Sequence, residues 1–87
     1  MIHEICAKAL EYYGGRSQTL MLFEEMSELQ KEICKNARGE DNTRFIAEEI
    51  ADVEIMLEQM KQLYDCRQAV EQQKHRKLLR LKERMGG

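Results

Sequence analysis

The chain has 87 residues, a length that allows one small domain over residues 1–87 and excludes more. Proline is absent and there are only five glycines, which favours long uninterrupted helices. Residues 1–65 carry seven Lys/Arg against fourteen Asp/Glu, whereas residues 66–87 carry seven against two, so an acidic body precedes a basic end. This division suits a site where a metal meets a polyphosphate, and it equally suits helices that pair by opposite charge.

The small size and the cysteine pattern of the chain predict self-association and a reducing environment. A domain near this size buries only about 60% of its unfolded surface, so we expect copies of the chain to associate. The three cysteines lie far apart with no Cys-x-x-Cys spacing, which predicts free thiols in a reduced, cytoplasmic setting. The amphipathic N-terminal segment does not resemble a secretory signal, and no apolar run approaches the ~18 residues needed to cross a bilayer. We therefore expect no membrane partner.

The first half of the chain predicts two helices separated by a glycine pair. Residues 2–13 carry apolar side chains on one helical stripe, and Gly14-Gly15 ends this helix. Ser17 is the expected N-cap of the next helix, residues 18–37. The apolar seam of that second helix has four- and three-residue spacings: Leu22, Met26, Leu29, Ile33 and Ala37.

The second half predicts two more helices after a polar loop at residues 38–42. Asn42 or Thr43 is the expected cap of a helix over residues 43–64, and a short break at residues 65–66 leads into a basic helix over residues 67–84. The buried positions expected in residues 43–64 are Ile46, Ile50, Val53, Leu57, Met60 and Tyr64. A thinner stripe follows at Val70, Leu78, Leu81 and Met85. The sequence predicts an all-α domain of three or four helices.

Two acidic pairs, Glu25/Glu28 and Glu49/Asp52, are the most informative feature of the sequence. Members of each pair are three residues apart, so they lie on one face of a helix with Cβ atoms roughly 5–6 Å apart. Each pair falls on the shoulder of its apolar seam, where a cleft between packed helices would open. Four converging carboxylates would repel one another without a cation, and oxygen-only ligand sets suit Mg²⁺ or Mn²⁺. We therefore predict a metal site and phosphate chemistry.

The competing interpretation of the acidic pairs is a set of solvated helix faces with local ion pairs. Glu28 can reach Lys31, and Glu32 can reach Lys35, at i+3 spacing. Such helical pairs contribute only about 0.2–0.5 kcal/mol, too little to hold four acids together in a cleft.

Two other readings fit the residues less well. A di-iron carboxylate bundle needs Glu-x-x-His motifs, and His3 and His75 lie outside both acidic pairs. Basic residues 74–84 could contact a phosphate backbone, but the acidic remainder of the chain argues against a nucleic-acid partner.

The motif Glu24-Glu25-Met-Ser-Glu28-Leu29, followed after a gap by Glu48-Glu49-Ile-Ala-Asp52-Val53, resembles the signature of MazG-like all-α nucleotide pyrophosphohydrolases. The resemblance covers about residues 17–64. It implies Mg²⁺-dependent cleavage of a nucleoside triphosphate to the monophosphate and pyrophosphate. It also implies a homodimer or homotetramer with a central four-helix bundle.

By this resemblance the metal ligands are Glu25, Glu28, Glu49 and Asp52. The general base stays open among three carboxylates: Glu24, Glu32 and Glu48. Basic side chains that could offset charge on the substrate are Lys31, Lys35, Arg38, Lys74 and Lys77. The alternative function is a non-catalytic helical interaction module that uses its acidic and basic faces to bind a partner.

Overall fold

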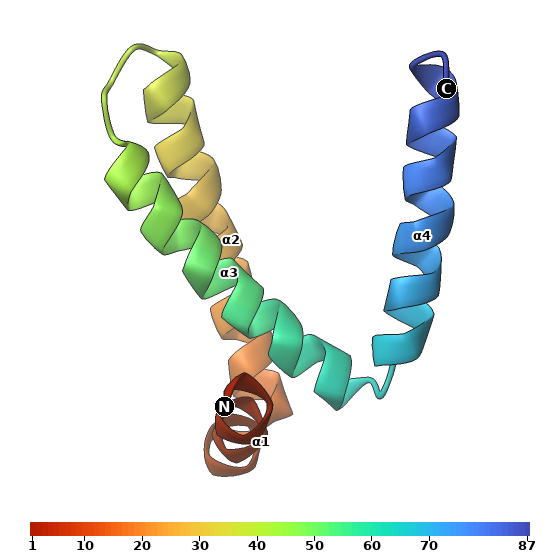
Figure 1. The fold of residues 1–87 in the computed structure, drawn as a ribbon. Helices are drawn as coiled ribbons and strands as arrows, with labels where there is room; N and C mark the ends of the chain where they lie inside the picture. The colour runs from red at the N-terminus through yellow and green to blue at the C-terminus, as the bar shows by residue number, and fades with distance from the viewer.

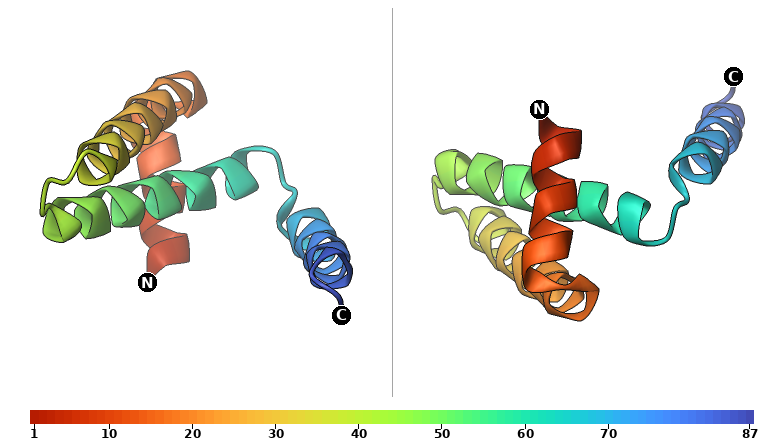
Figure 2. Two further views of the ribbon diagram at one scale, coloured as in Figure 1. Left: turned by 90° about the horizontal axis from the view of Figure 1, so that it is seen from above. Right: turned by 90° about the horizontal axis from the view of Figure 1, so that it is seen from below.

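The computed structural model describes residues 1–87, and its four regular elements are all helices. In chain order these are α1 (Ile2–Tyr13), α2 (Gly15–Ala37), α3 (Thr43–Leu63) and α4 (Arg67–Arg84) (Figure 1). The helices α2 and α3 run antiparallel side by side, α1 crosses both of them, and α4 stands apart (Figure 2). The prediction of an all-α fold is confirmed. None of the helices combines the length and the apolar character that crossing a membrane requires.

The turn between α1 and α2 is made by Gly14, not by a capping serine. Gly14 has a φ of 92°, a backbone conformation that side chains disfavour, and its N–H donates to the Leu10 carbonyl at 2.9 Å. The chain therefore enters α2 at Gly15, and Ser17 lies inside the helix, so the predicted cap is wrong. A Cβ on Gly15 would lie 2.8 Å from Leu63 Cδ1, because the start of α2 packs closely against the end of α3.

The connection between α2 and α3 is tied by a buried asparagine. Asn42 occupies the N-cap position of α3, as predicted, but its side chain does not cap that helix. Its amide Nδ2 instead donates to the Glu32 main-chain carbonyl at 2.8 Å and to Glu32 Oε1 at 2.9 Å. The last turns of α2 are thus bonded to the first residue before α3, which closes the hairpin.

The core of a single chain is small, since only eight of the 87 residues are buried. Along α2 the least exposed side chains follow one line, at Gln18, Leu22, Glu25, Leu29 and Glu32. The facing line of α3 is Ile46, Glu49, Val53, Met56 and Met60. The two helices therefore meet along a line that includes acidic shoulder positions and is displaced from the centre of each apolar seam.

This displacement leaves half of each predicted seam uncovered. On α2, Met26 and Ile33 are each 49% exposed, and on α3, Ile50 and Leu57 are each 43% exposed. The prediction that these four side chains are buried is wrong for the isolated chain. The same correction applies to two residues at the helix ends: Ala37 and Tyr64. A seam this wide can be covered only if another helix layer packs on the open face.

The helix α4 has no buried residue and projects from the rest of the chain (Figure 1). Of its predicted stripe, Val70 is half-buried, whereas Leu78, Leu81 and Met85 are exposed. The turn before it contains Asp65, whose φ of 49° lies in the left-handed region.

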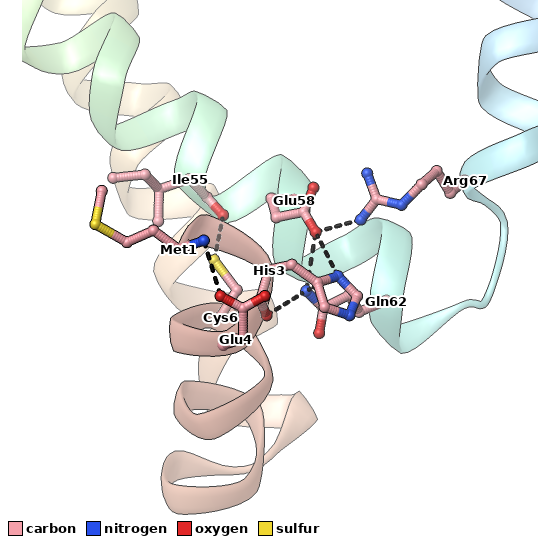
Figure 3. Close-up of polar contacts among 8 residues, drawn as sticks. All are labelled: Met1, His3, Glu4, Cys6, Ile55, Glu58, Gln62 and Arg67. Carbon is pink, nitrogen blue, oxygen red and sulfur yellow. Dashed lines mark hydrogen bonds and ion pairs between the residues drawn. The ribbon is translucent and has the colours of Figure 1, made fainter.

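The base of α4 is nevertheless tied down by a polar network (Figure 3). Arg67 donates to Glu58 Oε2, and Gln62 Nε2 donates to the same oxygen at 2.8 Å. Gln62 Nε2 also reaches the His3 carbonyl at 3.0 Å. This network joins α1, α3 and α4, and we call it the Glu58 latch.

Candidate metal centre

Three carboxylates meet where α2 and α3 pack against each other. Glu25 comes from α2, and Glu49 and Asp52 come from successive turns of α3. One ligand oxygen of each lies within 4.8 Å of the others. Glu25 and Glu49 are half-buried, because their shoulder positions fall on the helix–helix contact line, and Asp52 is exposed at its edge.

The electrostatics of this group oppose full ionisation of its members. Burial raises the pKa of Glu25, and the neighbouring Asp52 raises it further by its charge and by a side-chain hydrogen bond. Burial likewise raises the pKa of Glu49, with additional contributions from the charges of Asp52 and Glu28. Both carboxyls hold protons more tightly than free glutamate does. A cation in their midst would reverse this effect.

One oxygen of the group has no partner. Glu49 Oε2 is buried and accepts no hydrogen bond. A buried acceptor left unpaired costs free energy. Two amide oxygens elsewhere, Asn42 Oδ1 and Gln59 Oε1, are also buried and unpaired, so it is the position of the Glu49 oxygen among other carboxylates that favours a cation here. The three side chains offer only oxygen ligands, a donor set that fits hard divalent cations such as Mg²⁺ and Mn²⁺ and not softer ones.

Of the four carboxylates predicted as ligands, the fold brings these three together. Glu28 lies outside the group defined by the 4.8 Å distance. It is exposed on the next turn of α2, yet its charge acts on Glu49. Glu28 is therefore a neighbour of the cluster and not part of its closest set in the isolated chain.

Glu32 is held by its surroundings in a way that the sequence pattern did not reveal. Its Oε1 accepts the Asn42 amide, and Lys35 Nζ lies 3.3 Å from its Oε2. The hydrogen bond from Asn42, followed by the interaction with Lys35, lowers the pKa of Glu32. The only signal for this contact was a polar residue at the loop end, which also predicts an ordinary helix cap.

The other two candidate bases and the candidate substrate-binding residues lie on the surface. Glu24 and Glu48 are exposed, and Glu48 Oε1 is 3.8 Å from Arg44 Nε. The candidate basic residues, Lys35 apart, are exposed as well: Lys31, Arg38, Lys74 and Lys77.

These basic residues divide between two regions of the chain. Lys31, Lys35 and Arg38 lie on or just after the last turns of α2. Lys74 and Lys77 are on α4, which makes no contact with α2. A single chain therefore presents the two sets separately.

Comparison of the chain with protein-family models, with curated proteins and with solved structures finds no match in any of the three. The resemblance to MazG-like enzymes therefore depends on the two acidic motifs alone. Membership of that family stays a prediction.

Proposed function

We propose that the chain is a Mg²⁺-dependent nucleoside triphosphate pyrophosphohydrolase of the MazG-like type, with Mn²⁺ as a substitute ion. One observation carries the proposal: Glu25, Glu49 and Asp52 converge within 4.8 Å, and one Glu49 oxygen is buried without a partner. Carboxylates so arranged hold a cation that can bind polyphosphate. Without it, the negative site would repel a triphosphate.

Each carboxylate has a role in this proposal. Glu25, Glu49 and Asp52 hold the cation, and Glu28 completes the ligand set from the next turn of α2. A bound Mg²⁺ supplies an acidified water and positive charge beside the phosphates. Because the helix–helix contact fixes Glu25 and Glu49, the site is preorganised and the substrate does not have to order it.

The reaction is hydrolysis of the anhydride between the α- and β-phosphates. Water adds to phosphorus, the bridging P–O bond breaks, and the nucleoside monophosphate and pyrophosphate leave. A carboxylate takes the proton from the attacking water. Glu32 is the poorest of the three candidates, because Asn42 and Lys35 occupy its oxygens and its pKa is lowered. Glu24 has an exposed carboxylate without an ion-pair partner, and Glu48 has only a 3.8 Å contact with Arg44, so both stay candidate bases.

The basic residues at the end of α2 would offset charge on the substrate. Lys31 and Arg38 have no ion-pair partner in the chain, whereas Lys35 is already bonded to Glu32. We assign Lys31 and Arg38 to the phosphates and give Lys35 a positioning role through Glu32. Lys74 and Lys77 belong to this set only if α4 of one chain reaches another chain's site.

The proposal includes a homodimer or homotetramer built on a four-helix bundle. A compact protein of 10.3 kDa exposes about 5,400 Å², whereas this chain exposes 7007 Å². The radius of gyration is 15.7 Å, against about 12 Å for a compact chain of this length. The excess area, about 1,600 Å², exceeds the roughly 800 Å² that each partner contributes to a standard interface. Two α2–α3 hairpins packed through their open seams would make the bundle.

We place this activity in the cytoplasm, without a nucleic-acid partner. Cys6, Cys34 and Cys66 are all free thiols, a state that reducing compartments maintain. The chain combines a basic α4 with an acidic body, and this balance suits pairing within the protein's own assembly better than binding to a phosphate backbone.

A second candidate function is a non-catalytic helical interaction module. The wide open seams of α2 and α3 favour it, because they need a protein partner whether or not a metal binds. Both functions allow assembly in the presence of a chelator, but this alternative predicts a melting temperature that does not respond to Mg²⁺.

The test is a panel of ribo- and deoxyribonucleoside triphosphates incubated with the full chain and Mg²⁺, with pyrophosphate as the measured product. We expect pyrophosphate from at least one nucleotide, and a loss of about a hundredfold or more in Glu49→Gln. Glu54→Gln is the matched control, since Glu54 is exposed on the same helix and lies outside the cluster. Absence of pyrophosphate with every nucleotide, or equal rates in Glu49→Gln and wild type, would refute the enzyme assignment.

A further inference from the structure

A groove of about 630 Å³ lies between α3 and the base of α4. Its apolar lining includes Leu57 and Met60 from α3 and Val70 from α4. Lys74 lies at the α4 side of the same groove, one turn beyond Val70. The groove continues the open seam of α3, so an element seated on that seam would also touch α4.

The projecting position of α4 is fixed by the Glu58 latch. Glu58 is 7% exposed, and its carboxylate accepts from Arg67, the first residue of α4 (Figure 3). Gln62 and His3 hold the same carboxylate from α3 and α1, with His3 Nδ1 at 3.6 Å. A helix without a fixed orientation would not require a buried, hydrogen-bonded carboxylate at its first residue. The latch instead sets α4 at a defined angle to α3.

One face of α4 combines apolar and basic side chains. Leu78 and Leu81 line a shallow surface together with Lys74, Lys77 and Arg84. This face is about 27 Å long, the length of the whole helix. It lies in the basic segment, which carries seven Lys/Arg against two Asp/Glu, so it suits a surface that is both apolar and acidic.

The chain presents such a surface on the outer flank of α2. Leu20 and Phe23 are 57% and 58% exposed there. Phe23 borders a hollow whose acidic members are Glu24, Glu25 and Glu28, so the flank reaches the edge of the carboxylate cluster. The chain's own α4 does not contact α2, so this flank has no partner within the molecule.

We propose that α4 is a clasp for a second copy of this chain. The α2–α3 hairpin of that copy sits on the open seam and in the groove, and the basic face of α4 closes over its α2 flank. Lys74 and Lys77 then oppose Glu24 and Glu28 of the second copy. Because Glu28 also belongs to the proposed ligand set, these lysines would approach the edge of the second copy's carboxylate cluster. The proposal rests on the homo-oligomer of the proposed function, and its test is run without metal.

The test uses three variants of the full chain, each with two charges reversed. The arm variant, Lys74→Glu/Lys77→Glu, reverses two charges on the basic face of α4. The flank variant, Glu24→Lys/Glu28→Lys, reverses two charges on the outer flank of α2. The control, Arg76→Glu/Lys82→Glu, makes the same charge change outside the shallow surface that Lys74 and Lys77 line. At about 100° per residue, both control positions are turned by more than about 100° around α4 from the midpoint of Lys74 and Lys77. All six residues are exposed, so the variants should retain the fold, which circular dichroism verifies.

The dissociation constant of the assembly is measured by sedimentation in EDTA, so that neither metal binding nor activity enters the result. We expect the arm and flank variants to assemble about tenfold or more weakly than wild type, and the control to change less than about threefold. Equal dissociation constants for the arm variant and the control would overturn the proposal, as would a wild-type chain that stays monomeric at every concentration.

Mixing the arm and flank variants distinguishes a clasp between chains from an arm that folds back on its own chain. In a mixed pair the acidic α4 of the arm variant meets the basic flank of the flank variant, and the native basic α4 meets the native acidic flank. Heteromers should therefore form in preference to both homomers. Native mass spectrometry with one variant heavy-isotope labelled measures the ratio. A statistical mixture would contradict the exchange between chains, and this result would leave the metal site and the pyrophosphatase proposal untouched.

Discussion

At the scale of single residues, the carboxylate cluster is costly for the metal-free protein. Glu49 packs against a neighbouring helix with one oxygen unpaired, and burial with the charges of Asp52 and Glu28 raises its pKa. A carboxyl whose folded-state pKa is raised contributes stability that is present below its unfolded pKa and lost as pH rises through the folded value. In the metal-free protein, the contribution of Glu49 should therefore be lost as pH rises above about 4.3.

Substitution of Glu49 separates the destabilisation caused by its charge in the metal-free protein from its role in metal binding. In EDTA at neutral pH, Glu49→Gln should melt at a higher temperature than wild type, because it removes a repelling charge. On addition of Mg²⁺, the melting temperature of wild type should rise and that of Glu49→Gln should change little. Differential scanning calorimetry with and without Mg²⁺ measures both effects. A substitution that lowers the metal-free melting temperature would show that Glu49 is not under electrostatic strain.

Glu58 behaves in the opposite way. Hydrogen bonds from Arg67 and then from Gln62 lower its pKa to about 2. A carboxyl with a depressed folded-state pKa contributes stability that is present above its unfolded pKa and lost as pH falls through the folded value. The contribution of the latch should therefore be complete above about pH 4.5 and should disappear towards pH 2.

Glu58→Gln should lower the free energy of unfolding by about 1–2 kcal/mol at neutral pH, an amount moderated by the solvent exposure of Arg67. Denaturant unfolding at neutral and at acidic pH measures it, and the difference between variant and wild type should shrink in acid. Glu54→Gln, one turn earlier on α3, serves as the control and should change stability by less than about 0.5 kcal/mol. A difference that persists unchanged near pH 2 would exclude the charged latch.

At the scale of secondary-structure elements, local sequence patterns predicted most of the boundaries. The bounds of α1 and α4 agree with prediction, and α3 differs only at its last residue. The start of α2 was wrong, because Gly14 at positive φ allows the chain to turn without a serine cap. Periodicity depends on neighbours along one helix, so it predicts an apolar stripe but not which part of it meets the next helix.

The candidate site shows the same limit. Spacing predicted that Glu25, Glu49 and Asp52 lie on facing shoulders, and the fold brings them together. The contact between Asn42 and Glu32 joins a loop to a helix ten residues earlier, and no helical period encodes it. The Glu58 latch likewise requires the directions of three helices, which the sequence pattern does not supply.

Asn42 should be the residue on which the α2–α3 hairpin depends most. Asn42→Ala removes two hydrogen bonds from a buried position and leaves the Glu32 carbonyl without its side-chain donor. We expect a loss of about 1–3 kcal/mol in the free energy of unfolding. The control is Asn36→Ala, whose amide makes one exposed bond to the Glu40 carbonyl, and here the loss should stay below about 0.5 kcal/mol. Equal losses in chemical denaturation would contradict the role of Asn42.

At the scale of the whole molecule, the isolated chain has too little core for its surface. Only Cys6, Leu22 and Met56 are both apolar and buried, while many large apolar side chains stay exposed. In the proposed assembly, contacts between chains would supply the hydrophobic stabilisation that the single chain lacks. This distribution explains why half of each seam was predicted as core but lies open in the single chain.

If folding depends on association, thermal stability must depend on protein concentration. We expect the melting temperature to rise steadily with concentration in dilution series followed by circular dichroism, because mass action favours the folded oligomer. A melting temperature independent of concentration, together with a monomeric mass in sedimentation, would contradict this account of the molecule.

The central claim is that the Glu25–Glu49–Asp52 cluster holds a cation that binds the phosphates of a nucleotide. Its most direct test is calorimetric titration of the full chain with a deoxynucleoside triphosphate analogue that cannot be cleaved between the α- and β-phosphates. Wild type should bind the analogue with Mg²⁺ and fail to bind it in EDTA, and Glu49→Gln should weaken binding at least about tenfold. Equal binding with and without Mg²⁺, or by wild type and Glu49→Gln, would contradict the claim.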